Sequence, residues 1–374
     1  MSKIWIIIIL AIALRIFLSL ATYHPDIAAL ANGGQFIASG HILNLYDFSS
    51  DTLVLNYPPL IYWYFGFFDL FFNGIFGLLK LPYLIFDLLL GFLLYKMVEP
   101  KKALLAFTVW MFNPISLYAT YMMGQFDIIP TFFSVLSIYL AIKNKLALAA
   151  LALGGGIAFK LYPVFLIIPL ILLSKRWWMR AKIIILTILP YLVSVLPYLS
   201  SVNFRTNALF ANQSSKSLYA SIPVSGGESI LLFPTMLIVF YLLIWNEATN
   251  KMNLWKVYLI PLLVFFILTH FHPQWLIWVF PYLILELINN DFKNWIAQFL
   301  LLISWIISLF FFDPSLTIGL FAPLFPFLNN LPSIWIMMGI SMDYNFSRAI
   351  LQTVFAASAL LLIVRNFPKN AFQK

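Results

Sequence analysis

The chain contains no cysteine and few charged residues. The absence of cysteine among 374 residues excludes disulfides and thiolate metal sites. Four histidines are present, but none are paired at the i, i+4 spacing typical of zinc ligands. Charged residues make up 9% of the sequence, against about 25% in a soluble domain, whereas 63% of the residues are hydrophobic. Water therefore cannot be the main solvent of this protein.

Apolar blocks such as Ile4–Leu20 recur along the whole sequence. A bilayer core of roughly 30 Å needs about 20 apolar residues for each helical crossing. In lipid, the backbone hydrogen bonds of such a block are best satisfied within a helix. We therefore predict an all-α integral membrane protein with one polytopic domain over residues 1–374. The first block has no small-residue cleavage site, and we expect it to remain as the first helix.

The charge distribution predicts which loops face the cytoplasm. Lys and Arg exceed Asp and Glu, with a formal net charge of +9, and this excess is typical of positive-inside loops rather than of nucleic-acid binding. If both Tyr57–Phe72 and Leu81–Val98 crossed the membrane, Lys101 and Lys102 would lie outside, against the positive-inside rule, so one of the two segments should not cross. We choose Tyr57–Phe72, because it contains Pro58-Pro59 near its start and is rich in aromatic residues, and we predict that it lies in the outer interface.

About twelve crossings then remain. They are expected near residues 4–22, 81–98, 103–121, 125–142, 146–160, 162–174, 183–199, 229–247, 257–271, 274–288, 295–312 and 350–365.

The loops predicted to lie outside contain most of the unusual polar residues. Asp26 follows the first crossing, where a partly desolvated carboxylate could act as a general base. An N-cap for a helix that begins at Ile27 is an equally good interpretation. Asp47, Asp51 and Asp127 are the alternative carboxylates.

Four further outer turns carry polar or cationic groups. Gln125 and Asp127 lie in one turn, and Lys160 lies near the outer interface although most basic residues are inside. Snorkelling to lipid headgroups is the alternative for Lys160. His272 and Arg205 could bind an anion, whereas a plain interfacial turn and a solvated charge are the structural alternatives, and Lys216 follows Arg205 in the same loop. A carboxylate, amides and cations on one side suit a reaction that deprotonates an acceptor and releases an anion.

In these segments the sequence resembles polyprenyl-phosphate-sugar-dependent glycosyltransferases of the C superfamily, particularly mannosyltransferases. The similar motifs are Asp26, Asn44-Leu45-Tyr46, Tyr57-Pro58-Pro59-Leu60, Asn113-Pro114, Gly124-Gln125-Phe126-Asp127, Lys160 with Tyr162-Pro163, and His272-Pro273-Gln274-Trp275 with Trp278 and Pro281. The sequence departs from the family in that the first-loop acid is a single Asp without an adjacent Asp or Glu.

The resemblance implies an inverting transfer of a sugar, with mannose the expected one, at the extracytoplasmic face of the cell membrane. It assigns the base to Asp26 and the donor phosphate to Lys160, Arg205 and His272. Substrate contacts would come from Tyr57, Gln125, Asp127, Tyr162, Gln274 and Trp275. Residues 1–199 would form the catalytic module, and 200–374 would form a C-terminal module with a donor-binding loop.

The implied partners are a polyprenyl-phosphate-sugar donor, a glycolipid or glycan acceptor and membrane lipids. Neither a metal ion nor another cofactor is expected, because cations already hold the leaving phosphate. Two other functions stay open: a multi-pass transporter or lipid flippase, and a non-catalytic scaffold. A two-sided polar pathway would favour transport, whereas a chamber sealed on the cytoplasmic side would favour an enzyme.

Overall fold

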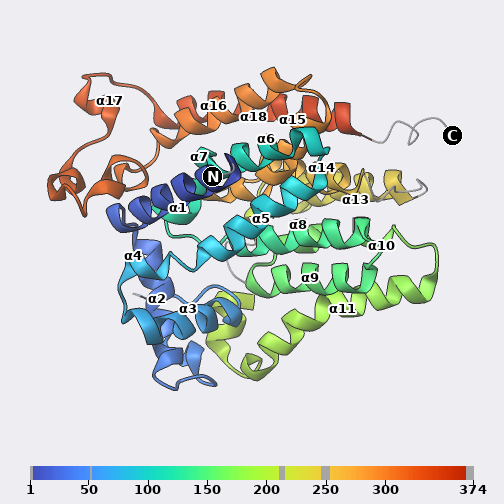
Figure 1. The fold of residues 1–374 in the computed structure, drawn as a ribbon, viewed down its shortest axis with the longest axis horizontal. Helices are drawn as coiled ribbons and strands as arrows, with labels where there is room; N and C mark the ends of the chain where they lie inside the picture. The colour runs from blue at the N-terminus through green and yellow to red at the C-terminus, as the bar shows by residue number, and fades with distance from the viewer. Residues whose placement is uncertain (1–2, 51–52, 210–214, 246–252, 368–374) are drawn as a thin grey trace.

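The structure is a computed structural model that describes residues 3–50, 53–209, 215–245 and 253–367 (Figure 1). The longer helices are α1 (Lys3–Ala21), α2 (Pro25–Ala38), α3 (Pro59–Phe72), α5 (Tyr83–Met97), α6 (Pro100–Met111), α8 (Ile128–Ile142), α9 (Leu146–Phe159), α11 (Trp177–Val195), α13 (Leu232–Trp245), α14 (Leu254–Leu268), α15 (Phe280–Asn289), α16 (Trp295–Leu309) and α18 (Tyr344–Asn366). Shorter helical turns are α4 (Phe76–Leu79), α7 (Pro114–Ser116), α10 (Ile167–Ile171), α17 (Ile334–Met337), the π-helix η2 (Leu117–Met122), and the 3₁₀ helices η1 (Leu45–Phe48), η3 (Tyr162–Leu166), η4 (Leu196–Tyr198), η6 (Lys216–Leu218), η8 (Pro273–Trp278), η9 (Pro314–Leu316), η10 (Ile318–Phe321) and η11 (Pro326–Asn330), with a second π-helix η5 (Phe204–Leu209).

The helical membrane character predicted from the sequence is confirmed. Among the described residues, five helical segments are long and apolar enough to cross a membrane: Lys3–Ala21, Phe76–Met97, Pro100–Met122, Trp177–Tyr198 and Tyr344–Asn366. Eight apolar helices are shorter, so the number of about twelve crossings stays a prediction. Apolar side chains face outward on α1 and α11, as lipid contact requires.

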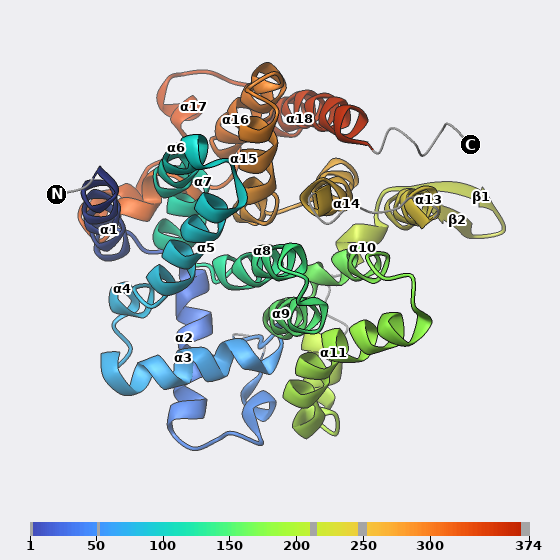
Figure 2. The same cartoon turned by 45° about the vertical axis from the view of Figure 1, so that its right-hand side comes forward.

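Helix α3 runs across the direction of much of the bundle. Figure 2 shows α3 lengthwise, whereas α9, α13 and α14 are seen nearly end-on. Helix α3 packs on α2, and the two approach so closely that a Cβ on Gly34 would lie 2.6 Å from the Cβ of Phe65. This orientation supports the prediction that Tyr57–Phe72 lies in the interface.

Contacts between loops agree with the sidedness assigned from charge. Tyr23 donates its backbone N–H to Leu320, and the predicted crossings place both residues in loops on the same side of the membrane as Asp26. Lys102 donates to the carbonyl of Ile288 and the carboxylate of Asp291, and all three are predicted to lie at the cytoplasmic side. The loop that carries α17 lies at the same end of the molecule as α2 and α4 (Figure 1).

Three local features differ from the sequence predictions. The expected crossing at 103–121 is broken after α6, where Asn113 caps the next turn and Pro114 cannot continue the hydrogen-bond ladder. The expected crossing at 274–288 begins as a 3₁₀ helix. The loop after residue 200 contains an antiparallel hairpin, β1 (Ser221–Ser225) and β2 (Glu228–Leu231), which departs from an all-helical fold.

A fully buried polar network closes the bundle core beside α1. Arg15 donates to Asp87 at 2.7 Å and to the carbonyl of Met111 at 2.8 Å. Trp110 and Tyr121 also donate to the carboxylate of Asp87. These side chains are all inaccessible to solvent, and none of them lines the cavities described below. The sequence analysis did not assign this network, although isolated charges inside apolar blocks are its signal.

Candidate active site

Asp26 lies in the first turn of α2, immediately after the chain leaves α1. The helix begins at Pro25, whose fixed φ suits a first helical position, and His24 is the N-cap because its Nδ1 accepts the N–H of Asp26. The interpretation of Asp26 as the N-cap of a helix that begins at Ile27 is therefore wrong. Its carboxylate instead accepts a hydrogen bond from the Nε2 of Gln125, and its side chain remains 44% exposed.

The turn that carries Gln125 is held by its backbone. Gln125 donates its N–H to the carbonyl of Ala119 in the π-helix, and Gly124 adopts a left-handed φ of 72°. A Cβ on Gly124 would also lie 3.0 Å from Ile27 of α2. The turn is thus packed directly against the first turns of α2, which brings Gln125 to Asp26 across 99 residues of sequence.

Lys160 ends α9 and forms a buried ion pair with Asp127. Its Nζ lies 2.7 Å from the Oδ1 of Asp127, which also accepts a hydrogen bond from the indole of Trp278. Asp127 occupies the N-cap position of α8, but its side chain makes no capping hydrogen bond there. The other carboxylate oxygen, Oδ2, is buried without a hydrogen-bond partner among the described residues. Because an ammonium carries three donor hydrogens, the pair leaves Lys160 able to bind a second anion.

Aromatic rings surround the Lys160 ammonium. Its Nζ lies between 5.1 and 5.4 Å from the ring centroids of Tyr57, Phe126, Trp275 and Trp278, which stabilises a cation. Behind them, the ring of Tyr162 stacks on Trp278 at 4.2 Å. A cavity of about 300 Å³ opens here, lined by Asn56, Tyr57, Pro58, Lys160, Leu161, Tyr162, Val164, Phe165, Ala208, Ser217, Phe265, Trp275 and Trp278.

A second cavity of about 170 Å³ holds Asp26 and shares Asn56, Tyr57 and Trp275 with the first. Its other lining residues are Ala29, Leu30, Val54, Tyr62, Gln125, His272 and Gln274. Within the described part of the chain, the Oε1 atoms of Gln125 and Gln274 are buried and accept no hydrogen bond. Two unpaired amide oxygens beside a carboxylate form a site that favours a ligand with several hydroxyl donors.

His272 lines the Asp26 cavity and also contacts Lys216. Its Nε2 is 2.9 Å from the Nζ of Lys216. Burial and the positive charges of Lys216 and Lys160 lower the pKa of His272 to about 4, so the imidazole is neutral at pH 7. A neutral imidazole can still bind an anion through its one N–H. Burial also lowers the pKa of Lys216.

The structure brings most of the predicted site residues together, and Arg205 is the exception. Its guanidinium is exposed and donates to the carbonyls of Leu199 and Ser200, and it lines neither cavity. Lys216 takes the place beside His272 instead. Asp47 is exposed on η1 and lines neither cavity, whereas Asp51 lies outside the described residues.

Lys80 is a buried cation near Asp26 that the sequence analysis did not assign. Its Nζ donates to the carbonyls of Ser19 and Thr22 at the end of α1 and of Tyr121 and Met122 in the π-helix. These two segments lead directly to Asp26 and to Gln125. Lys80 therefore fixes the two backbones that present the carboxylate and its amide partner.

Among the residues that the structure describes, no three His, Asp or Glu side chains are grouped as metal ligands. The prediction of a metal-independent reaction is untested by this observation.

The fold and the two adjoining cavities together define a polytopic helical membrane protein with a carboxylate site beside an aromatic, cationic cavity. Residues 120–221 match the profile of a family described as Mannosyltransferase (PIG-M). A stretch of 124 residues is 28% identical to GPI mannosyltransferase 1 of Saccharomyces cerevisiae and covers 30% of this chain. It spans 28% of that relative, less than a third of its length. No solved structure matches the chain significantly.

The resemblance to C-superfamily mannosyltransferases is therefore confirmed, and the family match covers residues 120–221. This segment includes Gln125, Asp127, Lys160, Tyr162 and Arg205. Asp26, His272, Gln274 and Trp275 lie outside the matched segment, and the fold brings them to the same cavity as Gln125.

Proposed function

We propose that this protein is an inverting glycosyltransferase. It would move mannose from a polyprenyl-phosphate donor to a hydroxyl of a lipid-linked or glycan acceptor, at the extracytoplasmic face of the cell membrane. The observation that carries this proposal is the cavity in which Asp26 lies beside the unpaired amide oxygens of Gln125 and Gln274. Sugar hydroxyls would donate to these oxygens, and the partly exposed Asp26 can receive the acceptor's proton.

In the proposed reaction, the acceptor O–H loses its proton to the carboxylate of Asp26. The oxygen attacks the anomeric carbon from the face opposite the donor phosphate. The bond from that carbon to the phosphate oxygen breaks, and its electron pair leaves with polyprenyl phosphate. Gln125 keeps the carboxylate in place through its Nε2 and contacts the substrate through its Oε1.

The adjoining aromatic cavity would hold the donor. Lys160 and Lys216 would neutralise the phosphate as negative charge develops on the leaving oxygen, and His272 would donate a hydrogen bond as a neutral group. Arg205 would join them only if its loop turned toward the cavity when the donor binds. Tyr57, Tyr162 and Trp275 would pack against the sugar and the first isoprene units.

Transport is the second candidate function, and the Arg15–Asp87 network argues against it. A transported polar molecule needs a polar route through the bundle. In the bundle core, Arg15, Trp110 and Tyr121 all donate hydrogen bonds to the carboxylate of Asp87, and the four side chains are fully buried. Opening a route there would break several buried charge-assisted hydrogen bonds, each costing about 1.5–3 kcal/mol.

The test compares Asp26→Asn with Asp127→Asn and Asp47→Asn, using purified protein, labelled polyprenyl-phosphate mannose and glycolipid acceptors. Asp26→Asn keeps the size and hydrogen-bonding capacity of the side chain but cannot take a proton. We expect turnover to fall by about 10²–10⁴-fold, with thermal stability and donor binding retained. Asp47→Asn, on an exposed turn, is the matched control and should keep normal turnover.

Near-normal turnover by Asp26→Asn together with loss in Asp127→Asn would assign the base to Asp127. An absence of transfer by the wild type, combined with donor uptake into sealed vesicles, would favour the transporter.

A further inference from the structure

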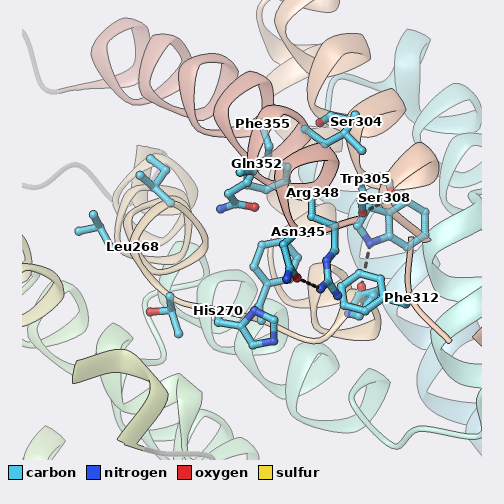
Figure 3. A pocket seen from close by; sticks show the side chains of 16 residues that line it. Leu268, His270, Ser304, Trp305, Ser308, Phe312, Asn345, Arg348, Gln352 and Phe355 are labelled. Atoms are coloured by element: carbon cyan, nitrogen blue, oxygen red, sulfur yellow. Dashed lines mark hydrogen bonds between the residues drawn. The ribbon is translucent and has the colours of Figure 1, made fainter. Parts of the chain in front are cut away.

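A cavity of about 510 Å³ lies beside the Asp26 cavity, between α14, α16 and α18 (Figure 3). Thr269, His270, Phe271 and Pro273 line it, whereas His272 and Gln274 of the same segment line the Asp26 cavity. The two spaces are therefore separated by one segment of chain. The indole of Trp305 donates to the carbonyl of Pro273 and holds this wall in place.

The lining residues of this cavity include one arginine, Arg348, and no lysine. Its guanidinium lies 4.9 Å from the ring centroid of Phe312 and donates to the side-chain oxygen of Asn345. No ion pair is formed by Arg348 within the described ranges. The nearby carboxylates cap backbone instead: Asp343 accepts from two N–H groups of α18, and Asp313 accepts from Ser315. Arg348 therefore has donor hydrogens for an anion.

Two neighbouring groups add further unpaired donors. Thr269 is 3% exposed, and its hydroxyl has no hydrogen-bond partner among the described residues. The ring of His270 lines the same cavity and carries an N–H donor. A guanidinium, a hydroxyl and an imidazole N–H together suit a ligand with several acceptor oxygens, such as a phosphate.

The rest of the cavity is apolar. Leu268 of α14 and Leu351 and Phe355 of α18 line it, and Figure 3 shows Leu268 and Phe355 placed away from the His270 ring. Helix α18 is one of the segments long and apolar enough to cross a membrane. A free phosphate ion would leave this apolar surface unfilled, whereas the hydrocarbon chain of a lipid would cover it.

We propose that this cavity binds a phosphate-bearing membrane lipid, with its headgroup at Arg348, Thr269 and His270 and its chains against α14 and α18. The site is separate from the aromatic cavity around Lys160. It does not depend on the proposed transfer reaction, because binding can be measured without turnover.

The experiment uses the full chain in nanodiscs and a short-chain phosphatidic acid that carries a photoactivatable group on an acyl chain. After irradiation, mass spectrometry maps the labelled peptides. We expect labelling of peptides from α14 and α18. Arg348→Gln should weaken this labelling about tenfold, the effect of losing one charge-assisted hydrogen bond. Arg176→Gln is the matched control, because Arg176 also lies near an aromatic ring, that of Trp178, but lines none of these cavities.

Ala349→Phe provides an independent variant, since it fills the cavity and keeps the charge. It should also reduce labelling of α14 and α18. An excess of the unlabelled phosphatidic acid should protect these peptides, whereas the diacylglycerol of equal chain length and inorganic phosphate should not. Protection by inorganic phosphate alone would indicate a free-anion site and overturn the proposal. Equal labelling in the wild type and in both cavity variants would overturn it as well.

Discussion

Lys80 and Lys160 are both buried, and both lie close to the segment 121–127, yet their surroundings differ. Lys80 is enclosed by four backbone carbonyls and has no carboxylate partner among the described residues. Lys160 contacts one carboxylate oxygen of Asp127, faces four aromatic rings and lines a cavity.

The difference separates a structural cation from a binding cation. The acceptors around Lys80 are carbonyls at the end of α1 and in the π-helix, together with the hydroxyl of Thr22, so Lys80 joins two segments of backbone. The rings around Lys160 accept no strong hydrogen bond, so an anion in the cavity can replace part of the hydration that the ammonium lost. Burial alone therefore does not decide whether a charged residue in a membrane protein binds a ligand. What decides it is whether the charged group also faces a cavity that a ligand can enter.

Lys80→Met should give the largest loss of stability. It removes the short hydrogen bonds that the ammonium donates to the carbonyls of Thr22 and Tyr121, and charge-assisted hydrogen bonds contribute about 1.5–3 kcal/mol each, so we expect a loss of about 3–6 kcal/mol. Thermal denaturation in detergent measures this effect. Lys96→Met is the control, because Lys96 is exposed in the last turn of α5, the helix that begins three residues after Lys80. Equal behaviour of the two variants would contradict a structural role for Lys80.

Lys160→Met should cost about 3 kcal/mol, because it leaves the charge of Asp127 buried and unpaired. Adding Asp127→Asn removes that charge and should recover most of the stability. Transfer should not recover: the donor KM should stay raised, and kcat should stay lowered if the contact strengthens as the phosphate leaves. A double variant that regains both stability and donor binding would show that Lys160 is structural, as Lys80 is.

A smaller effect is expected from pH. The folded-state pKa of His272 is about 4, below its ordinary value of 6.5, so the unfolded chain takes up the proton first as the pH falls. Stability should therefore be lost between about pH 6.5 and pH 4, and His272→Gln should flatten part of that slope. His41→Gln, on an exposed loop, should leave the slope unchanged. Parallel slopes for the wild type and His272→Gln would contradict the buried neutral imidazole.

The topology can be tested with almost no energetic effect. The chain has no cysteine, so Lys101→Cys introduces a single thiol on an exposed position. We expect it to react with a membrane-impermeant reagent only after the cytoplasmic side is opened. Labelling from outside would mean that Tyr57–Phe72 crosses the membrane, and the placement of Lys160 near the outer interface would need revision.

Much of the fold was predictable from hydropathy and from turn-forming residues. The helical segments lie close to the predicted blocks, as in α1, α9 and α16, because apolar length alone requires a helix in lipid. The break after α6 was less predictable, because Asn113-Pro114 can occur inside a kinked helix as well as at the end of a helix. The hairpin β1–β2 lies in a loop where periodicity carries no signal.

The sequence by itself determined that the chain is a helical membrane protein and that Asp26, Gln125, Lys160 and His272 lie in turns at one side of it. Tertiary structure alone decided that Gln125 pairs with Asp26, that Asp127 pairs with Lys160, and that Arg205 turns back to its own loop. It also decided the cavity at Arg348. The physical reason is that side-chain pairing depends on the rotation and depth of each helix, and hydropathy fixes neither.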